Sequence, residues 1–149
     1  MKVESMYHTG FTVSDIDRSI EFYGDLLGMS LFRRQTGTAA YLSTITGFEK
    51  VRIEIALLKA PDGSGMLELL EYVSHPGAAT PRETNRPGNG HLCFKVSDIH
   101  QACRELRARG VTLLSDPVEI TAGVHAGAFG VYLRDPDGFT VELFQPGPA

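Results

Sequence analysis

The sequence contains an internal repeat, which limits the possible folds of this chain more than any other feature. Residues 8–16 read HTGFTVSDI and residues 91–99 read HLCFKVSDI, with six of nine positions identical. A second match relates APDGSGMLELL at 60–70 to DPDGFTVELF at 135–144. Each half therefore begins and ends with similar segments, which predicts two copies of one small module.

Each half is expected to fold as β-α-β-β-β. The first segment of each half alternates polar and apolar residues as a strand does, and the Ser-Asp that follows is typical of a helix N-cap. Apolar residues at helical spacing run on toward Gly28 and Gly110, where the helices are expected to end. Three further strands are predicted in each half, at about 29–35, 51–59 and 65–73 and at about 111–120, 127–134 and 139–145.

The predicted fold class is therefore α+β, with two paired modules that form a cup. The first module covers 1–73, a linker rich in Pro and Gly covers 74–89, and the second module covers 90–149. Each module has a size at which an independent core is marginal. The modules are expected to pack together, within one chain or between the two chains of a homodimer.

Composition excludes several kinds of partner. The 149 residues carry a net charge of −4, and 42% of them are hydrophobic. This predicts a folded chain without the basic surface that nucleic acid or anionic membranes require. No apolar stretch approaches the roughly 20 residues of a membrane span. With two cysteines, and an N-terminus MKVESMYHTG unlike a signal peptide, a cytoplasmic location with reduced thiols is expected.

Two histidines and two glutamates occupy equivalent places in the repeat. His8 and His91 begin the first strands, and Glu68 and Glu142 lie within the last strands. Because alternate residues of a strand share a face, the apolar neighbours of each glutamate are expected to pack on the helix. The four polar side chains then point to the opposite face of the sheet, which is the inside of the cup.

These four side chains predict a shared metal site. A carboxylate among apolar neighbours in a strand is unfavourable unless it is paired or bound to a metal. Any one of the four has an ordinary structural explanation, but four that obey one repeat favour a common role. Two His nitrogens and two Glu oxygens suit a divalent ion such as Ni, Co, Zn, Mn or Fe, with positions left open for substrate.

The segments HTGFTVSDIDRSIEFYGDLLGM, GHLCFKVSDI and DPDGFTVELFQP resemble the vicinal oxygen chelate superfamily. That superfamily includes glyoxalase I, methylmalonyl-CoA epimerase, extradiol dioxygenases, fosfomycin-resistance enzymes and bleomycin-resistance proteins. The resemblance implies that His8, His91 and Glu142 hold the metal. It also implies that Glu68 is a fourth ligand, as in the glyoxalase and epimerase branches, whereas extradiol dioxygenases leave that position unligated.

The resemblance implies a lyase or isomerase acting on a small molecule with two adjacent oxygens. The metal would chelate both oxygens and stabilise an enediolate, while Glu68 or Glu142 moves the proton. Glu49 is the nearest match to the base of the epimerases, one residue closer to the following strand. The segment LLEYVSHPG differs from the glyoxalase segment that shapes the glutathione site, so glutathione is not implied.

Three other residues are candidates for substrate contact. An insertion at 36–50, present only in the first half, carries Tyr41 and Phe48. It is expected to be a loop that gives the site an apolar wall, with dimer contact as the alternative. His125 lies in a glycine-rich loop before a strand that leads to the site, with simple exposure as the alternative. Cys93 is expected to face the cup as a buried, unreactive thiol.

Three other functions stay open. One is an iron-dependent ring-cleaving dioxygenase that uses His8, His91 and Glu142. Another is an enzyme of the fosfomycin-resistance kind that opens an epoxide by addition. The third is a drug-binding resistance protein without catalysis, which needs no metal ligands. Metal analysis separates the binding protein from the enzymes, and oxygen consumption separates the dioxygenase from the lyase or isomerase.

Overall fold

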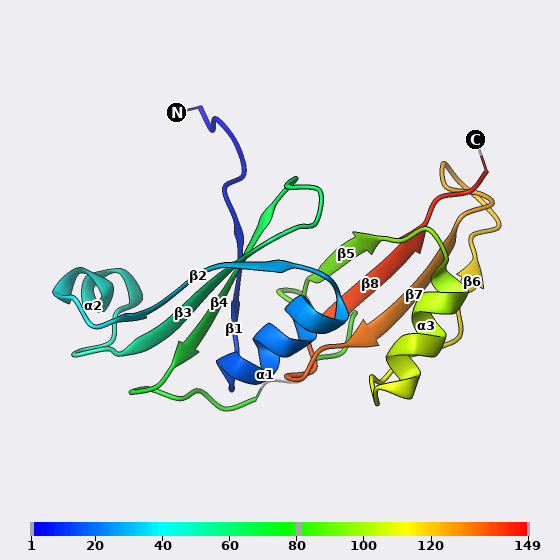
Figure 1. Cartoon of the computed structure of the whole chain (residues 1–149). Coiled ribbons are helices and arrows are strands. Elements are labelled where there is room, and N and C mark those ends of the chain that lie inside the picture. Colours follow the sequence, from blue (N-terminus) through cyan, green and yellow to red (C-terminus); the bar gives the residue numbers. More distant parts are fainter. Residues whose placement is uncertain (1, 80–81, 149) are drawn as a thin grey trace. The chain divides into compact units, whose positions relative to one another are not determined.

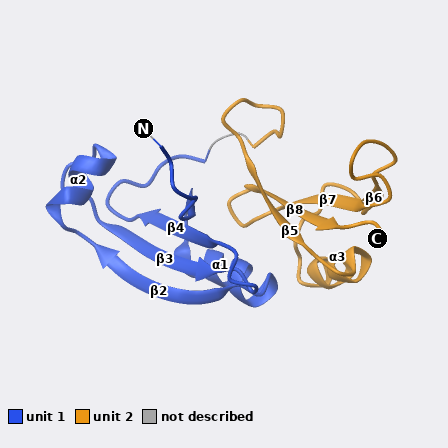
Figure 2. Cartoon of the chain, turned by 90° about the horizontal axis from the view of Figure 1, so that it is seen from above, with its two compact units in different colours: residues 1–79 blue, residues 80–149 orange. Residues whose placement is uncertain are grey.

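The computed structural model describes residues 2–79 and 82–148. The chain forms two compact units, Met1–Ala79 and Thr80–Ala149, which Figure 2 colours blue and orange. The first unit contains β1 (Thr9–Thr12), α1 (Ile16–Ile20), the π-helical segment η1 (Glu21–Leu26), β2 (Ser30–Gly37), α2 (Ala40–Thr46), β3 (Ile53–Lys59) and β4 (Met66–Tyr72). The second contains β5 (His91–Lys95), α3 (Ile99–Ala108), β6 (Val118–Glu119), β7 (Phe129–Arg134) and β8 (Thr140–Gln145).

Each unit is a four-stranded mixed sheet with the same connectivity (Figure 1). The strand orders are β1-β4-β3-β2 and β5-β8-β7-β6. In each sheet the first strand runs parallel to the last, and the other neighbours are antiparallel. The PDG turns close the β3–β4 and β7–β8 hairpins, as predicted. The predicted α+β fold of two β-α-β-β-β modules is confirmed.

One face of each sheet packs against a helix and forms the core. Leu67 and Leu69 of β4 are buried on this face, and so are Val141 and Leu143 of β8. The side chains of Asp15 and Asp98 cap α1 and α3 as predicted, because each accepts a hydrogen bond from a first-turn backbone N–H. We call the opposite face, which carries Glu68 or Glu142, the inner face.

In both units, an equivalent side-chain hydrogen bond joins the last strand to the start of the helix. Glu71 of β4 accepts a 3.0 Å hydrogen bond from the backbone N–H of Ile16. Gln145 of β8 accepts a 2.8 Å bond from the backbone N–H of Ile99. Glu71 and Gln145 each lie three residues beyond the candidate ligand on their strand. The repeat therefore preserves the attachment of each helix start to the strand that carries the glutamate.

Two expected elements differ from the structure. The strand predicted at 111–120 is reduced to Val118–Glu119, together with an isolated bridge between Leu113 and Leu133. The insertion at 36–50 is not only a loop, because α2 forms its centre (Figure 1). Turn residues flank this segment, and its short apolar pattern gave no helix signal long enough to recognise.

Helix α2 packs on the inner face of the first sheet. Leu42 of α2 joins a buried cluster with Val51, Ile53 and Ile55, against which Leu70 and Tyr72 also pack. Gly37 allows this packing, because a Cβ there would lie 2.5 Å from Leu42 Cδ1. The insertion therefore covers the end of the inner face near Tyr72, while Glu68 lies further along the same strand.

Parts of the predictions lie beyond the described residues. Residues 80 and 81 of the predicted linker, residue 1 of the first module and residue 149 of the second fall there. Across 2–79 and 82–148, no helix has the length and apolar character needed to cross a bilayer.

Candidate metal and substrate site

The first unit brings His8 and Glu68 together. His8 immediately precedes β1, and Gly10 of β1 pairs with Glu68 in the parallel register. His8 Nε2 lies 3.2 Å from Glu68 Oε2. The Glu68 side chain is 22% exposed, so its carboxylate is half-buried but still reachable from solvent. We call this contact the first half-site.

The second unit repeats the arrangement with His91 and Glu142. Cys93 of β5 pairs with Glu142 of β8, as Gly10 pairs with Glu68 in the first unit. His91 Nε2 lies 3.0 Å from Glu142 Oε2, and the Glu142 side chain is 20% exposed. The distance and the burial of the second half-site therefore match those of the first.

The spacing of donor atoms in each half-site suits a divalent ion. Two ligand atoms about 2.1 Å from one ion, at octahedral or tetrahedral angles, lie about 3.0–3.4 Å apart. Both contacts between Nε2 and Oε2 fall in this range. Each half-site offers two donors, and no group of three or more His, Cys, Asp or Glu suited to a metal occurs among the described residues. Each half-site therefore supplies one nitrogen donor and one oxygen donor.

The surroundings of the two glutamates differ. Leu57 lies opposite Glu68 on β3, whereas Tyr132 lies opposite Glu142 on β7. Burial raises the pKa of the Cys93 thiol to about 11, with further contributions from the negative charge of Glu142 and a hydrogen bond to it. Burial also raises the pKa of Tyr132, and the charge of Glu142 adds to this. Glu142 therefore has protonated polar neighbours that Glu68 lacks.

Two residues near Glu142 differ from what the sequence predicts: Cys93, whose exposure differs, and Tyr132, which was not predicted. Cys93 as a whole is exposed on β5, so the expectation of a buried residue is wrong, although its thiol is partly shielded from solvent beside Glu142. Tyr132 was not predicted, yet its ring lies 5.4 Å from that of His91. The PDG turn and the alternation in FGVYLR could have placed Tyr132 opposite Glu142, because a hairpin turn sets the register of its strands.

The residues of the insertion lie on α2 and in the turn after it. Tyr41 is exposed on α2, and Glu49 is exposed in the turn before β3. The Phe48 ring lies 5.8 Å from Tyr72 and 5.0 Å from His75, so it closes the end of the α2 cluster. No contact within 2–79 and 82–148 joins Glu49 to the His8–Glu68 pair.

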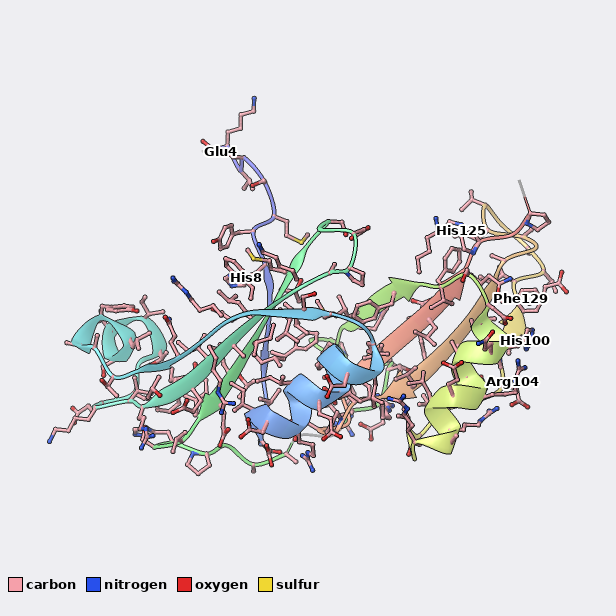
Figure 3. All side chains as sticks on the ribbon, in the orientation of Figure 1. Glu4, His8, His100, Arg104, His125 and Phe129 are labelled. Carbon is pink, nitrogen blue, oxygen red and sulfur yellow. The ribbon has the colours of Figure 1, made fainter. Side chains whose placement is uncertain are left out.

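His125 lies on the loop before β7, and His8 on the segment that leads into β1 (Figure 3). The His125 ring packs edge-on against Phe144, with ring centroids 5.2 Å apart. Phe144 is two residues from Glu142 on β8, so the two side chains share the inner face. His125 is therefore an exposed ring held on the face that carries the second half-site.

Comparison with known proteins agrees with this architecture. A profile of the Glyoxalase/Bleomycin resistance protein/Dioxygenase superfamily matches residues 5–143. The chain is 30% identical over 145 residues to the "Probable lactoylglutathione lyase" of Vibrio cholerae, which covers 97% of this chain and 93% of that protein. It is 31% identical over 145 residues to the 2-epi-5-epi-valiolone epimerase of an Actinomyces species, covering 95% and 79%.

A lyase and an epimerase therefore both occur among the relatives. The chain spans only 44% of the length of the lactoylglutathione lyase of Arabidopsis thaliana, to which it is 30% identical. The crystal structure of a glyoxalase family protein from Bacillus cereus has the same fold, with a TM-score of 0.86 at 24% identity, covering 99% of this chain and 97% of that one. The profile match and the two β-α-β-β-β units together show that the chain belongs to the glyoxalase/bleomycin resistance protein/dioxygenase superfamily.

Proposed function

We propose that this chain is a metal-dependent lyase or isomerase of glyoxalase or epimerase type. His8, Glu68, His91 and Glu142 would hold one divalent ion, which is Ni, Co, Zn, Mn or Fe. The observation that carries the proposal is the duplication of the His–Glu contact, at 3.2 Å and 3.0 Å, on equivalent strands. In both units the contact joins one nitrogen and one oxygen donor on the inner face, which is the arrangement that a shared ligand set requires.

The chemistry follows from the donor set. When bound, a divalent ion acts as a Lewis acid on a substrate carbonyl flanked by a second oxygen. His8 and His91 would serve only as ligands. Glu68 and Glu142 each contact a histidine through one carboxylate oxygen, Oε2. The other oxygen of either carboxylate would take the proton from the substrate carbon next to the polarised carbonyl and return it to that carbon or to its neighbour.

The different neighbours of Glu68 and Glu142 favour different roles for the two glutamates in the reaction. Glu142 on β8 lies between two polar neighbours, Cys93 on β5 and Tyr132 on β7. Glu68 faces Leu57 and has Gly10 in the place of Cys93, so it is freer to change its position. The α2 cluster and Phe48 would form an apolar wall beside Glu68, and His125 would contact substrate beside the second half-site.

Metal analysis and solvent-proton exchange test this function. We expect one divalent ion per chain, and metal-dependent uptake of deuterium from D2O into thiohemiacetals of 2-oxoaldehydes or into acyl thioesters, followed by NMR. Glu68→Gln should abolish exchange, whereas Glu54→Gln, on the helix-packed face, should leave it unchanged. His91→Ala should lose the ion, and His100→Ala, which removes a ring beside Phe129, should retain it.

The opposite results identify the competing functions. A metal-loaded protein that exchanges no proton but consumes oxygen with catechols is a dioxygenase. A protein that binds none of these ions, yet binds an apolar drug, belongs with the resistance proteins.

A further inference from the structure

The first sheet carries two consecutive arginines that point to opposite faces. Arg34 pairs with Ala56 in the register of β2 and β3, and its guanidinium pairs with Asp17 of α1 on the helix-packed face. Arg33 pairs with Leu57, and Leu57 in turn pairs with Glu68. Directly paired residues of neighbouring antiparallel strands share a face. Arg33 therefore lies on the inner face, in the same row as Glu68.

A β-bulge produces this orientation. Leu31 pairs with Leu58 and Arg33 pairs with Leu57, so the register shifts at Phe32. Without the shift, strict alternation would place Arg33 on the helix-packed face with Leu31. Bulges commonly re-aim a side chain next to a functional site. Here the bulge moves one cation to the side of the sheet that carries the first half-site.

Lys59 brings a second cation to the same corner of the inner face. It pairs with Met66 and follows Leu57 by two residues, so its side chain shares the face with Arg33. Lys59 Nζ lies 3.7 Å from the centroid of the Phe32 ring, which fixes the bulged residue by a cation–π contact. The corner thus combines an aromatic ring with two positive charges.

Arg33 differs from three other arginines of the chain, whose side chains already have partners. Arg34 is bound to Asp17, Arg52 lies 3.4 Å from Glu54, and Arg134 donates to Gly138 and Thr140. Within 2–79 and 82–148, neither a salt bridge nor a side-chain hydrogen bond involves Arg33, which is exposed. Its guanidinium is available to an external anion.

We propose that Arg33, supported by Lys59, binds a carboxylate or phosphate group of the substrate, so that the substrate is an anion with two chelating oxygens at its other end. This inference rests on the proposed metal-dependent function. Glu68 and Arg33 are separated by two strand spacings, or about 10 Å between backbones. A substrate can therefore lie across Leu57, with its chelating end at Glu68 and its anionic end at Arg33.

Matched hydroxamates test the site on zinc-loaded protein by isothermal titration calorimetry. Hydroxamates chelate through two adjacent oxygens, and the series would carry two to four methylenes that end in a carboxylate or in the uncharged amide. We expect at least one carboxylate to bind about three- to fivefold more tightly than its amide, as a charged hydrogen bond to an exposed arginine allows. Arg33→Gln should remove this preference.

Arg34→Gln is the matched control, because it removes the same charge from the next residue on the other face. It should keep the preference for the carboxylate, and both variants should bind acetohydroxamate as the unmodified protein does. If acetohydroxamate binds but no carboxylate is preferred, or if Arg33→Gln keeps the preference, the role of Arg33 is disproved while the metal function stands.

A second measurement keeps the two proposals separable. In metal-free protein, titration with inorganic phosphate should shift the Arg33 Nε–H resonance, and Arg33→Gln should abolish the associated shifts in β2. If no hydroxamate binds but phosphate shifts Arg33, the metal function fails and the anion site stands. If phosphate leaves Arg33 unshifted, the anion site is overturned.

Discussion

Glu71 on β4 accepts a hydrogen bond from the backbone N–H of Ile16, 55 residues earlier in the chain. This contact ties the start of α1 to the strand that carries Glu68. The second unit makes the same attachment with Gln145 and Ile99. The acceptor can therefore be a carboxylate or an amide, which indicates that its geometry matters more than its charge.

Removing this acceptor should destabilise the first unit. Glu71→Ala leaves the N–H of Ile16 without its partner, and we expect a loss of about 1–2 kcal/mol in the free energy of unfolding. Glu71→Gln copies the second unit and should stay within about 0.5 kcal/mol of the unmodified protein. Urea denaturation followed by circular dichroism measures both. Equal losses for Ala and Gln would show that the charge, not the acceptor position, stabilises the unit.

The two half-sites should contribute alike to metal binding. His8→Ala and His91→Ala each remove one nitrogen from equivalent contacts, so each should lower zinc affinity at least about 100-fold, measured by competition with a chelator. An unaffected His8→Ala variant would contradict a site that uses both units.

Mixing these two variants decides how the half-sites meet. If the first half-site of one chain joins the second half-site of its partner in a homodimer, a mixed dimer keeps one intact site and regains half of the metal. If both half-sites come from one chain, the mixture regains none. Metal analysis after subunit exchange distinguishes these arrangements.

The α2 cluster should depend on Leu42. Leu42 is buried against Ile53 and Ile55, so Leu42→Ala should lower the free energy of unfolding by about 2–3 kcal/mol. Ile45 lies on the same helix but is 75% exposed, so Ile45→Ala should change it by less than about 0.5 kcal/mol. Calorimetric unfolding measures both. Metal content should be unchanged in each variant, because His8 and Glu68 are outside the cluster; a loss of metal in Leu42→Ala would contradict this.

The cysteines should differ in reactivity. The pKa of Cys93 is raised to about 11 by burial and then by the charge of Glu142, so in metal-free protein its alkylation by iodoacetamide should be slow at pH 7.5. The rate should rise about tenfold per pH unit up to that pKa. Glu142→Gln removes a negative charge, lowers the pKa and should accelerate alkylation. Buried Cys103 should react only after unfolding.

The raised pKa of Cys93 also makes the free energy of unfolding depend on pH. The folded pKa of Cys93 is raised above its usual value of 9.0. The contribution of the protonated thiol is therefore complete below pH 9 and is lost as the pH rises through about 11. Denaturation of metal-free Cys93→Ser between pH 8 and pH 11 should show a smaller loss of stability than the unmodified protein.

The repeat explains how much of the site was predictable. His8 and Glu68, and equally His91 and Glu142, are neighbours in the structure because the parallel pairing of first and last strands follows from the β-α-β-β-β order. Alternation around each glutamate then predicts its face. These are local or repeated signals, and two copies of each made them recognisable.

The sequence by itself determined the module, its duplication, the hairpins, the helix caps and the two repeat positions that carry the histidines and the glutamates. Only the tertiary structure revealed the bulge at Phe32, the inner-face position of Arg33, the packing of α2 and the attachment of Glu71 to Ile16. The difference is physical. Period and capping are set by residues close in the chain, whereas a bulge or a long-range hydrogen bond depends on which distant backbone lies beside it.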